Sequence, residues 1–507
     1  MNIAETVAEP EKLRRVVIEP LSRVEGHGKV TLLLDEEHHI RQARLHIVEF
    51  RGFEKFIQGR PYWEVPIVVQ RLCGICPVSH HLAAGKAVDQ LVGVHELPPT
   101  AEKIRRLLHL GQTLQSHAVH FFHLASPDFL FDYDDLASHR NVVGVIADHP
   151  EIARRGVLLR KYGQEVIRVV AGKRVHGIAT VPGGVNKALT VAERDYLLTD
   201  LDQMIEWGRD VIQRMRQAFE KNPGYYTDFA TIRSHYLSLI RADGALDLYH
   251  GGLRAKNRRG GLIFDHLDYQ RYEQVLREQV KPWSYMKFPF INSLGPEQGW
   301  YRVGSLARIN NCDFIPTPLA EQERRDFMAM GRGQLIHVTL AYHWTRMIEL
   351  LYSAEAIKEL LHDPDLLGGE LAAPLGSLAQ EGIGVVEAPR GTLFHHYRIN
   401  EDGLIEKANL IVSTTNNNQA MNESIRQVAE RYLNGKELTE PLLNQIEVAV
   451  RAYDPCLSCA THALGQMPLV VELVEEASGT VVDCLVRDAD GTIRNAEFPH
   501  ALERGLA

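Results

Sequence analysis

The chain of 507 residues lacks the features that mark membrane, nucleic-acid-binding and secreted proteins. It has no run of about 18 apolar residues, and its first residues, MNIAETVAEPEKLRR, do not form the charged and then apolar pattern of a secretory signal. It also has no basic block: 56 basic residues face 65 acidic ones, which gives a formal net charge of -9. We therefore expect a cytoplasmic protein with no membrane span and no nucleic-acid partner.

Cysteine is scarce, with six residues in the whole chain. Six are too few to form a disulfide scaffold in a protein of this length. Four of them form two Cys-x-x-Cys pairs: Cys73 and Cys76 in RLCGICPVSHH, and Cys456 and Cys459 in YDPCLSCATH. This pattern indicates thiolate chemistry in a reducing compartment.

The hydrophobic pattern predicts a mainly α-helical protein with a smaller β part, of the α+β class. Residues 14–50 contain two β-branched runs separated by the polar EEHH, which is typical of a hairpin. Helical patterns over 99–125 and 321–362 are long enough for the core of a bundle, the second weakened at two glycines near residue 332. A strand, a turn and a strand are predicted from Gly382.

Three regions follow from these patterns. Residues 1–50 are expected to form a β-rich segment, and residues 51–462 a helical catalytic core with inserted β segments. Residues 463–507 differ from the core, because their short apolar runs are broken at Ser-Gly and Asp-Gly, as in strands joined by turns. We therefore treat them as a separate C-terminal extension.

Both cysteine pairs are expected where a loop enters a helix. Pro77 follows Cys76 and opens a helical pattern, while Asp454 and Pro455 have the residue types of an N-cap and a first helical position. Free N–H groups and the positive dipole end at a helix start favour a thiolate over a thiol. Both pairs are thus suited to bind a metal.

Spacing alone leaves several sites possible. Structural zinc sites commonly use pairs about 15 to 20 residues apart, whereas these pairs lie near opposite ends of the chain. A thioredoxin-type dithiol needs only one pair, and two structural turns that never meet would also fit. If the pairs meet, their four thiolates form a soft site suited to zinc, iron–sulfur or nickel–iron chemistry.

Around these pairs the sequence resembles the large subunit of the nickel-iron hydrogenases. The family motifs R-x-C-G-x-C-x-x-x-H and D-P-C-x-x-C-x-x-H are matched by Arg71, Cys73, Gly74, Cys76 and His80, and by Asp454, Pro455, Cys456, Cys459 and His462. RVEGHG, EFRGFEKF, VPGGVN and EAPRG extend the likeness over nearly the whole chain up to His462. WSYMKFP and HHYR are similar to the cytoplasmic branch that reduces NAD.

The resemblance implies a metal centre that splits H2 heterolytically. Cys73 and Cys456 would be terminal nickel ligands, and Cys76 and Cys459 would bridge nickel to an iron that carries carbon monoxide and cyanide. Outside this set, the matched motifs imply that Pro389 and Thr414 contact the ligands of the iron. Such contacts orient and tune a metal rather than bind it.

Further roles come from the same matched motifs. Glu25 would relay protons near the sulfur of Cys456, and Arg390 would stand over the open metal position with Asp454 beside it. Glu54 and His462 match the ligands of a separate Mg2+ site.

The electrons must leave through partners, because the chain has no Gly-rich dinucleotide fingerprint and its motif cysteines are already used. The resemblance implies a small subunit with an iron-sulfur cluster and diaphorase subunits that use FMN and NAD. It also implies a maturation endopeptidase that cuts after His462 and removes 463–507.

Three alternatives share the same fold. A hydrogen-sensing regulatory subunit would usually lack a cleavable extension, and the related subunit of respiratory complex I has lost the cysteine ligands. The large subunit of a deazaflavin-linked hydrogenase would differ mainly in the partner that accepts electrons. The catalytic subunit of an NAD-linked hydrogenase therefore fits the sequence best.

Overall fold

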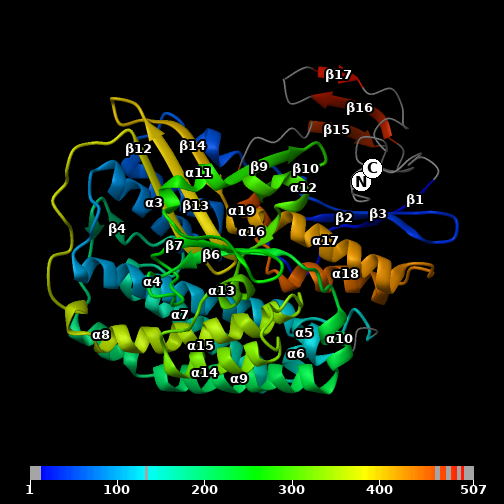
Figure 1. Ribbon diagram of the computed structural model, residues 1–507, viewed down its shortest axis with the longest axis horizontal. Helices are drawn as coiled ribbons and strands as arrows, with labels where there is room; N and C mark the ends of the chain where they lie inside the picture. Colours follow the sequence, from blue (N-terminus) through cyan, green and yellow to red (C-terminus); the bar gives the residue numbers. More distant parts are fainter. Residues whose placement is uncertain (1–12, 132–134, 463–468, 475–480, 488–492, 496–507) are drawn as a thin grey trace.

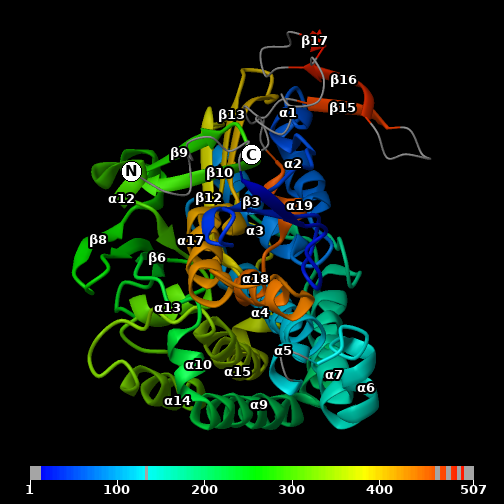
Figure 2. The same cartoon turned by 90° about the vertical axis from the view of Figure 1, so that its right-hand side faces the viewer.

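The computed structural model describes residues 13–131 and 135–462 together with 469–474, 481–487 and 493–495. The prediction of an α+β fold is confirmed. Long helices occupy one side of the molecule, and several small sheets lie on the other (Figure 1). Rotation by a quarter turn shows the helices as a layered group below the sheets (Figure 2).

The N-terminal region forms the predicted hairpin and adds a strand to it. β1 (Arg14–Ile18), β2 (Lys29–Leu34) and β3 (Ile40–His46) pair in that order, all antiparallel. Their apolar side chains enter the core, and α17 (Asn418–Val428) packs against β3. The loop between β1 and β2 carries Glu25 to the functional site.

The helical core is built around α4 (Pro99–Val119), which packs against α7 (Pro150–Ala171) and α15 (Ala341–His362). Gly111 and Gly163 let the backbones of α4 and α7 meet, because a Cβ atom at Gly163 would lie 2.5 Å from the Gly111 carbonyl oxygen. The helix predicted over 99–125 changes to π-helical hydrogen bonding at residues 120–125.

The helix predicted over 321–362 is interrupted. It consists of α14 (Pro318–Ala329) and α15, with an irregular segment between them. The break lies at the glycines that weakened the pattern, and Gly333 has φ 82, which a side-chain-bearing residue rarely adopts. The prediction of a single helix over 321–362 was therefore wrong, because the backbone at Gly333 adopts a left-handed conformation that ends the helical hydrogen bonding.

The strand, turn and strand predicted from Gly382 are β12 (Glu381–Ala388) and β13 (Gly391–Ile399). β14 (Ile405–Ile411) pairs with β13 and completes an antiparallel sheet of three strands. α3 (Pro77–Leu91) lies directly on β12. Gly384 makes this possible, because a Cβ atom there would come within 1.9 Å of the Ala83 carbonyl oxygen. This packing brings the start of α3 and the turn after β12 to one place.

The other elements are helices and strands that surround this core, and among them α9 is as long as α4. The helices are α1 (Phe53–Phe56), α2 (Val65–Val68), α5 (Pro127–Leu130), α6 (Val142–Asp148), α8 (Val191–Leu198), α9 (Leu201–Lys221), α10 (Pro223–Asp228), α11 (Tyr272–Val275), α12 (Gly295–Gln298), α13 (Ser305–Asn311), α16 (Ser413–Asn416), α18 (Glu440–Ala452) and α19 (Leu457–Ala460). The strands are β4 (Thr180–Val181), β5 (Gly184–Val185), β6 (His235–Ile240), β7 (Gly252–Lys256), β8 (Leu262–Leu267), β9 (Leu276–Lys281), β10 (Ser284–Ile291) and β11 (Tyr301–Arg302).

The C-terminal region contributes an antiparallel sheet of β15 (Leu469–Val474), β16 (Val481–Arg487) and β17 (Ile493–Asn495), at the upper edge of Figure 1. The turns predicted between these strands lie outside the described residues. Across the described part of the chain, none of the helices is long and apolar enough to cross a bilayer.

Candidate metal centre

The two cysteine pairs meet. The Sγ atoms of Cys73 and Cys456 are 3.3 Å apart, and those of Cys76 and Cys459 are 3.7 Å apart. All four lie within 4.8 Å of one another. Each is at most 3 % exposed, and all four are free rather than joined in disulfides. The structure thus gathers four buried sulfur ligands at one point.

The first pair is held by its own local backbone and by two distant side chains, since His176 donates to the Cys73 carbonyl oxygen at 3.0 Å and Gln115 to the Ile75 carbonyl oxygen at 2.6 Å. Cys76 is the N-cap residue of α3, and Pro77 is the first helical residue, as the sequence predicts. The N–H groups of Ile75 and Cys76 both donate to the Sγ of Cys73 at 3.2 Å. These local donors favour a thiolate at Cys73, as does the Cys456 thiol across the cluster.

The second pair is held differently, and the predicted N-cap is wrong. α19 starts at Leu457 with Cys456 as its N-cap, while Asp454 has φ 53 and lies outside the helix. The reason is that Glu25 takes the capping role. Its carbonyl oxygen accepts from the Leu457 N–H at 2.9 Å, and its carboxylate accepts from the Ser458 N–H at 3.2 Å.

Asp454 instead pairs with Arg390, which lies in the turn between β12 and β13. The Nε of Arg390 donates to the Asp454 carbonyl oxygen at 2.6 Å, and its Nη2 donates to the carboxylate at 3.1 Å. Both side chains are 1 % exposed. Although burial acts against the charge, the Asp454 carboxylate and the cysteine sulfurs raise the pKa of Arg390, so a cation faces the thiol cluster.

Thr414 and Pro389 flank the same space. The Thr414 hydroxyl accepts from the Cys456 N–H at 3.0 Å, so it fixes the backbone of the second pair. Pro389 immediately precedes Arg390 in the turn, and its carbonyl oxygen accepts from Arg308 at 3.2 Å. The structure thus brings Thr414 into contact with Cys456, whereas Pro389 is placed through its neighbour Arg390.

Crowding of four buried sulfurs opposes simultaneous ionisation. Hydrogen bonding from the Cys456 thiol lowers the pKa of Cys73 well below its ordinary value. Burial raises the pKa values of Cys456 and Cys459 well above theirs. A positive metal charge would reverse this for the last two, since a coordinating thiol is deprotonated outright.

Glu54 and His462 also come together, next to the thiol cluster. The His462 Nε2 lies 3.8 Å from a Glu54 carboxylate oxygen, and its Nδ1 donates to the Cys459 carbonyl oxygen at 2.9 Å. The Glu54 N–H donates to the His462 carbonyl oxygen at 3.1 Å. Burial lowers the pKa of His462 to about 4, which keeps its free nitrogen available as a ligand.

Sequence reasoning missed two charged residues at this place, Glu278 and Lys287. The Lys287 ammonium donates to the Glu278 carboxylate at 3.2 Å. Burial raises the pKa of Glu278, and the pKa values of both residues respond to the charge of Glu54. Lys287 lies within WSYMKFP and could have been examined there, whereas Glu278 carries no local signal.

These residues fit the implied metals. Four buried thiols form the soft donor set that nickel and iron prefer. Near them, Arg390 Nη1 and Asp454 Oδ2 are buried and have no hydrogen-bond partner among the described residues, which leaves a donor for ligands on a metal. His462 Nε2 and Glu278 Oε1 are likewise unpartnered, and with Glu54 they offer oxygen and nitrogen atoms suited to a hard cation.

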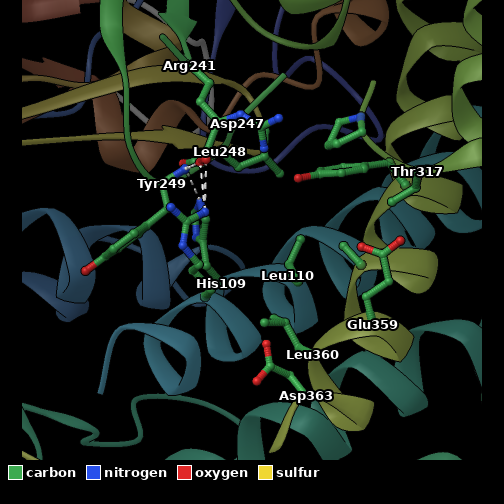
Figure 3. A pocket seen from close by; sticks show the side chains of 14 residues that line it. His109, Leu110, Arg241, Asp247, Leu248, Tyr249, Thr317, Glu359, Leu360 and Asp363 are labelled. Carbon is green, nitrogen blue, oxygen red and sulfur yellow. Dashed lines mark hydrogen bonds and ion pairs between the residues drawn. The ribbon is translucent and has the colours of Figure 1, made fainter. Parts of the chain in front are cut away.

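A cavity of about 280 Å³ lies between α4 and α15, away from the cysteines (Figure 3). Its wall includes the ion pair of Arg106 and Asp247 and the ring of His109. The His109 Nε2 donates to the Glu387 carbonyl oxygen at 3.0 Å. The cavity is therefore linked to the strand that leads to Arg390, but none of the four cysteines lines it.

Comparison with known proteins points to the same family as the cysteine motifs. The family described as nickel-dependent hydrogenase matches residues 51–139 and 270–462, and one described as HoxL-like matches residues 15–50. The beta subunit of the NAD-reducing hydrogenase HoxS of Cupriavidus necator is 49% identical over 93% of this chain and 99% of its own length. One subunit of the F420-non-reducing hydrogenase vhc of Methanococcus voltae is 39% identical over 93% of this chain and 100% of its own length.

Solved structures of hydrogenases have the same fold as this chain. A NAD+-reducing [NiFe]-hydrogenase in the H2-reduced state superposes with a TM-score of 0.87 at 55% identity and covers 89% of this chain and 99% of its own. A Ni-Fe-Se hydrogenase from D. vulgaris Hildenborough, at 22% identity and a TM-score of 0.71, shares the fold over 89% of this chain and 100% of its own. With its four convergent cysteines and these matches, the chain belongs to the nickel-dependent hydrogenase family.

Proposed function

We propose that this chain is the catalytic subunit of a hydrogenase that reversibly converts H2 into two protons and two electrons and passes the electrons towards NAD. One observation carries the proposal: four buried thiols from the two ends of the chain converge within 4.8 Å. A structural clip would not need a buried cation, Arg390, beside it.

The chain's own residues divide the work at this centre. Cys73 and Cys456 would hold nickel, and Cys76 and Cys459 would hold both nickel and an iron bearing carbon monoxide and cyanide. When bound, this group would supply the polarisation that splits H2 heterolytically. Arg390 would direct its unpartnered Nη1 towards the ligands on the metals, and Asp454 would hold that guanidinium in place.

Glu25 is the proposed proton relay. It is half-buried, pairs with Cys456 along the backbone, and has its carboxylate fixed by the Ser458 N–H. A carboxylate held beside a thiolate ligand can accept a proton from the sulfur and release it towards the surface. Thr414 and Pro389 would contact the ligands of the iron and fix their orientation.

A Mg2+ ion held by Glu54 and His462 is part of the same proposal. Such an ion would neutralise the carboxylates of Glu54 and Glu278 and tie the segment around His462 to α1. Electrons would leave through an iron-sulfur small subunit, then through diaphorase subunits carrying FMN. The likeness to subunits of NAD-reducing hydrogenases supports these partners and a soluble cytoplasmic complex.

We also propose that residues 1–50, 51–462 and 463–507 are separate functional regions, and that a maturation endopeptidase removes the last of them. The support is sequence-based, since His462 ends the second cysteine motif. The methanogen relatives named F420-non-reducing hydrogenases give no support to a deazaflavin acceptor, and no observation favours a hydrogen sensor.

The test is metal analysis and turnover of the protein purified anaerobically from its own host. We expect about one nickel per chain, a C-terminal mass that ends at His462, and H2-dependent reduction of NAD+ by the whole complex. Zinc in place of nickel in mature protein would contradict the proposal. NAD+ that stays oxidised while H2 reduces an artificial dye would contradict only the acceptor.

A further inference from the structure

Arg390 stands in a tight turn whose position depends on a second buried arginine, Arg308 of α13. Arg308 is 0 % exposed. Its Nη1 donates to the Ala388 carbonyl oxygen at 3.0 Å, and its Nη2 donates to the Pro389 carbonyl oxygen at 3.2 Å. These are the two carbonyl groups that directly precede Arg390.

The other donors of Arg308 are bound to two buried carboxylates. Its Nε and Nη2 donate to the two Glu349 oxygens, both at 2.6 Å, and its Nη1 donates to Glu387 at 2.8 Å. A guanidinium has five N–H donors in a rigid plane. With five contacts, Arg308 has no rotational freedom left.

Each carboxylate is fixed in turn. The second Glu387 oxygen accepts from the Leu239 N–H and from the Thr392 hydroxyl, both at 2.8 Å. His117 of α4 lies 2.9 Å from Glu349 of α15. The cluster therefore ties three helices to both sides of the turn that contains Arg390.

Stability alone does not account for such a cluster, because buried ionic groups can often be replaced by apolar ones without loss of stability. What a saturated guanidinium supplies is a defined position. Arg390 depends on such a defined position of the turn. Among the described residues its side chain is hydrogen-bonded only to Asp454, and its Nη1 has no hydrogen-bond partner. A misplacement of about 1 Å in an active site can cost roughly a hundredfold in rate.

We propose that Arg308 is a positioning residue for the hydrogenase reaction, which places the Arg390 guanidinium by holding the Ala388 and Pro389 carbonyl groups. This inference rests on the proposed function, in which Arg390 acts beside the metals.

The first test is Arg308→Lys in the full complex, with H2/D2O exchange measured per bound nickel. A lysine keeps the charge but has three donors on a flexible stem, so it cannot hold both carbonyl groups and both carboxylates. We expect the exchange rate per nickel to fall about tenfold to a hundredfold, with the KM for H2 unchanged.

Arg105→Lys is the matched control. Arg105 is also 0 % exposed, but its partners are different and lie at the far end of α3, at β4 and β5, and at Tyr249: Asp89, Val181, Gly184 and Tyr249. It loses a comparable set of buried hydrogen bonds, so it reports what a general loss of stability does. We expect its exchange rate per nickel to stay within about twofold of wild type, as for distant independent sites.

A double-variant cycle separates positioning from a general structural effect. If Arg308 acts through Arg390, then adding Arg308→Lys to Arg390→Lys costs no more than about twofold beyond Arg390→Lys alone. Full additivity of the two losses would overturn the inference.

Two further outcomes are decided in the same experiment. If Arg308→Lys fails to take up nickel, Glu387→Gln is tested in its place. Glutamine keeps the shape of the side chain but weakens the contact with Arg308. A wild-type exchange rate per nickel in Glu387→Gln would overturn the inference. If wild-type protein itself contains no nickel or shows no exchange, the proposed function fails instead.

Discussion

The two cysteine pairs are matched in sequence but are held in different ways. Cys73 and Cys76 have local support, because two N–H groups of their own loop donate to a sulfur and Pro77 starts a long helix. His176 and Gln115 add contacts to the carbonyl groups of that loop. The second pair starts a helix of only four residues. Its backbone is instead held by Glu25 and Thr414, which lie far away in the sequence.

We infer that the first pair is set more by its own loop and that the second is docked. Local N–H donors and a long helix contribute to the first pair, whereas the backbone of the second pair is held by Glu25 and Thr414. We therefore expect the second pair to be more sensitive to changes outside its own motif.

The largest expected effect comes from removing one thiol of either pair. Cys73→Ser and Cys456→Ser should each lower the nickel content to less than a tenth of wild type, because even an outer partner of a ligand contributes about 10- to 100-fold in metal affinity. Elemental analysis measures this. Cys312→Ala is the control, since Cys312 is equally buried but lies at the end of α13, where its thiol donates to the Ile309 carbonyl oxygen. A normal nickel content in Cys456→Ser would mean that the pairs do not share a metal.

A smaller effect is expected from Glu25→Gln, which tests the docked pair as a proton relay. Glutamine keeps an acceptor for the Ser458 N–H but cannot carry the proton, and general acid–base catalysis contributes about 10²- to 10⁴-fold. We expect H2/D2O exchange per nickel to fall by about a hundredfold while nickel content is unchanged.

Glu19→Gln is the matched control for that variant, because Glu19 lies in the same N-terminal region and pairs with Lys29 at the surface. Equal exchange rates in Glu25→Gln and wild type would remove Glu25 from the proton path.

The pH dependence probes the support of the first pair. His81 of α3 donates from Nδ1 to the Pro66 carbonyl oxygen at 2.7 Å, and its Nε2 accepts from the N–H groups of Ala179 and Thr180. Acceptance at Nε2 requires the neutral ring, and burial lowers the pKa of His81 from 6.5 to about 4. Below pH 6.5 the unfolded chain therefore binds a proton that the folded chain does not, so stability falls as the pH falls towards 4.

This single histidine should lower the free energy of unfolding by about 2 kcal/mol at pH 5 relative to pH 7.5. Hydrogen exchange, corrected for its intrinsic pH dependence, should show lost protection at Ala179 and Thr180. Helix α9 contains no histidine and serves as the internal reference. Unchanged protection at pH 5 would contradict the neutral-ring assignment.

The smallest effect is expected from Thr414→Val, which removes the acceptor for the Cys456 N–H. An unsatisfied buried donor costs about 1–3 kcal/mol, so the segment 453–462 should exchange its amide hydrogens faster, while α3 stays protected. Thr414→Ser keeps the hydroxyl and should behave as wild type. Equal exchange in α3 and in 453–462 after Thr414→Val would remove the distinction between a locally supported and a docked pair.

Much of the fold was predictable, because it depends on patterns within a few residues. The N-terminal hairpin, α3 with its proline start, and the strands on both sides of Arg390 follow from alternation, helical periodicity and turn residues. The break between α14 and α15 was signalled by glycine but was not predicted as a break.

For the site, the sequence by itself determined the donor types, since two Cys-x-x-Cys motifs restrict the chemistry to soft metals or redox thiols, and the family motifs assigned the remaining roles. Tertiary structure alone decided that Glu25 caps α19 and that Glu278 and Arg308 join the site. The physical reason is that these contacts join residues far apart in the chain. Local patterns report neighbours within about one helical turn, whereas such partners meet only after the core has packed.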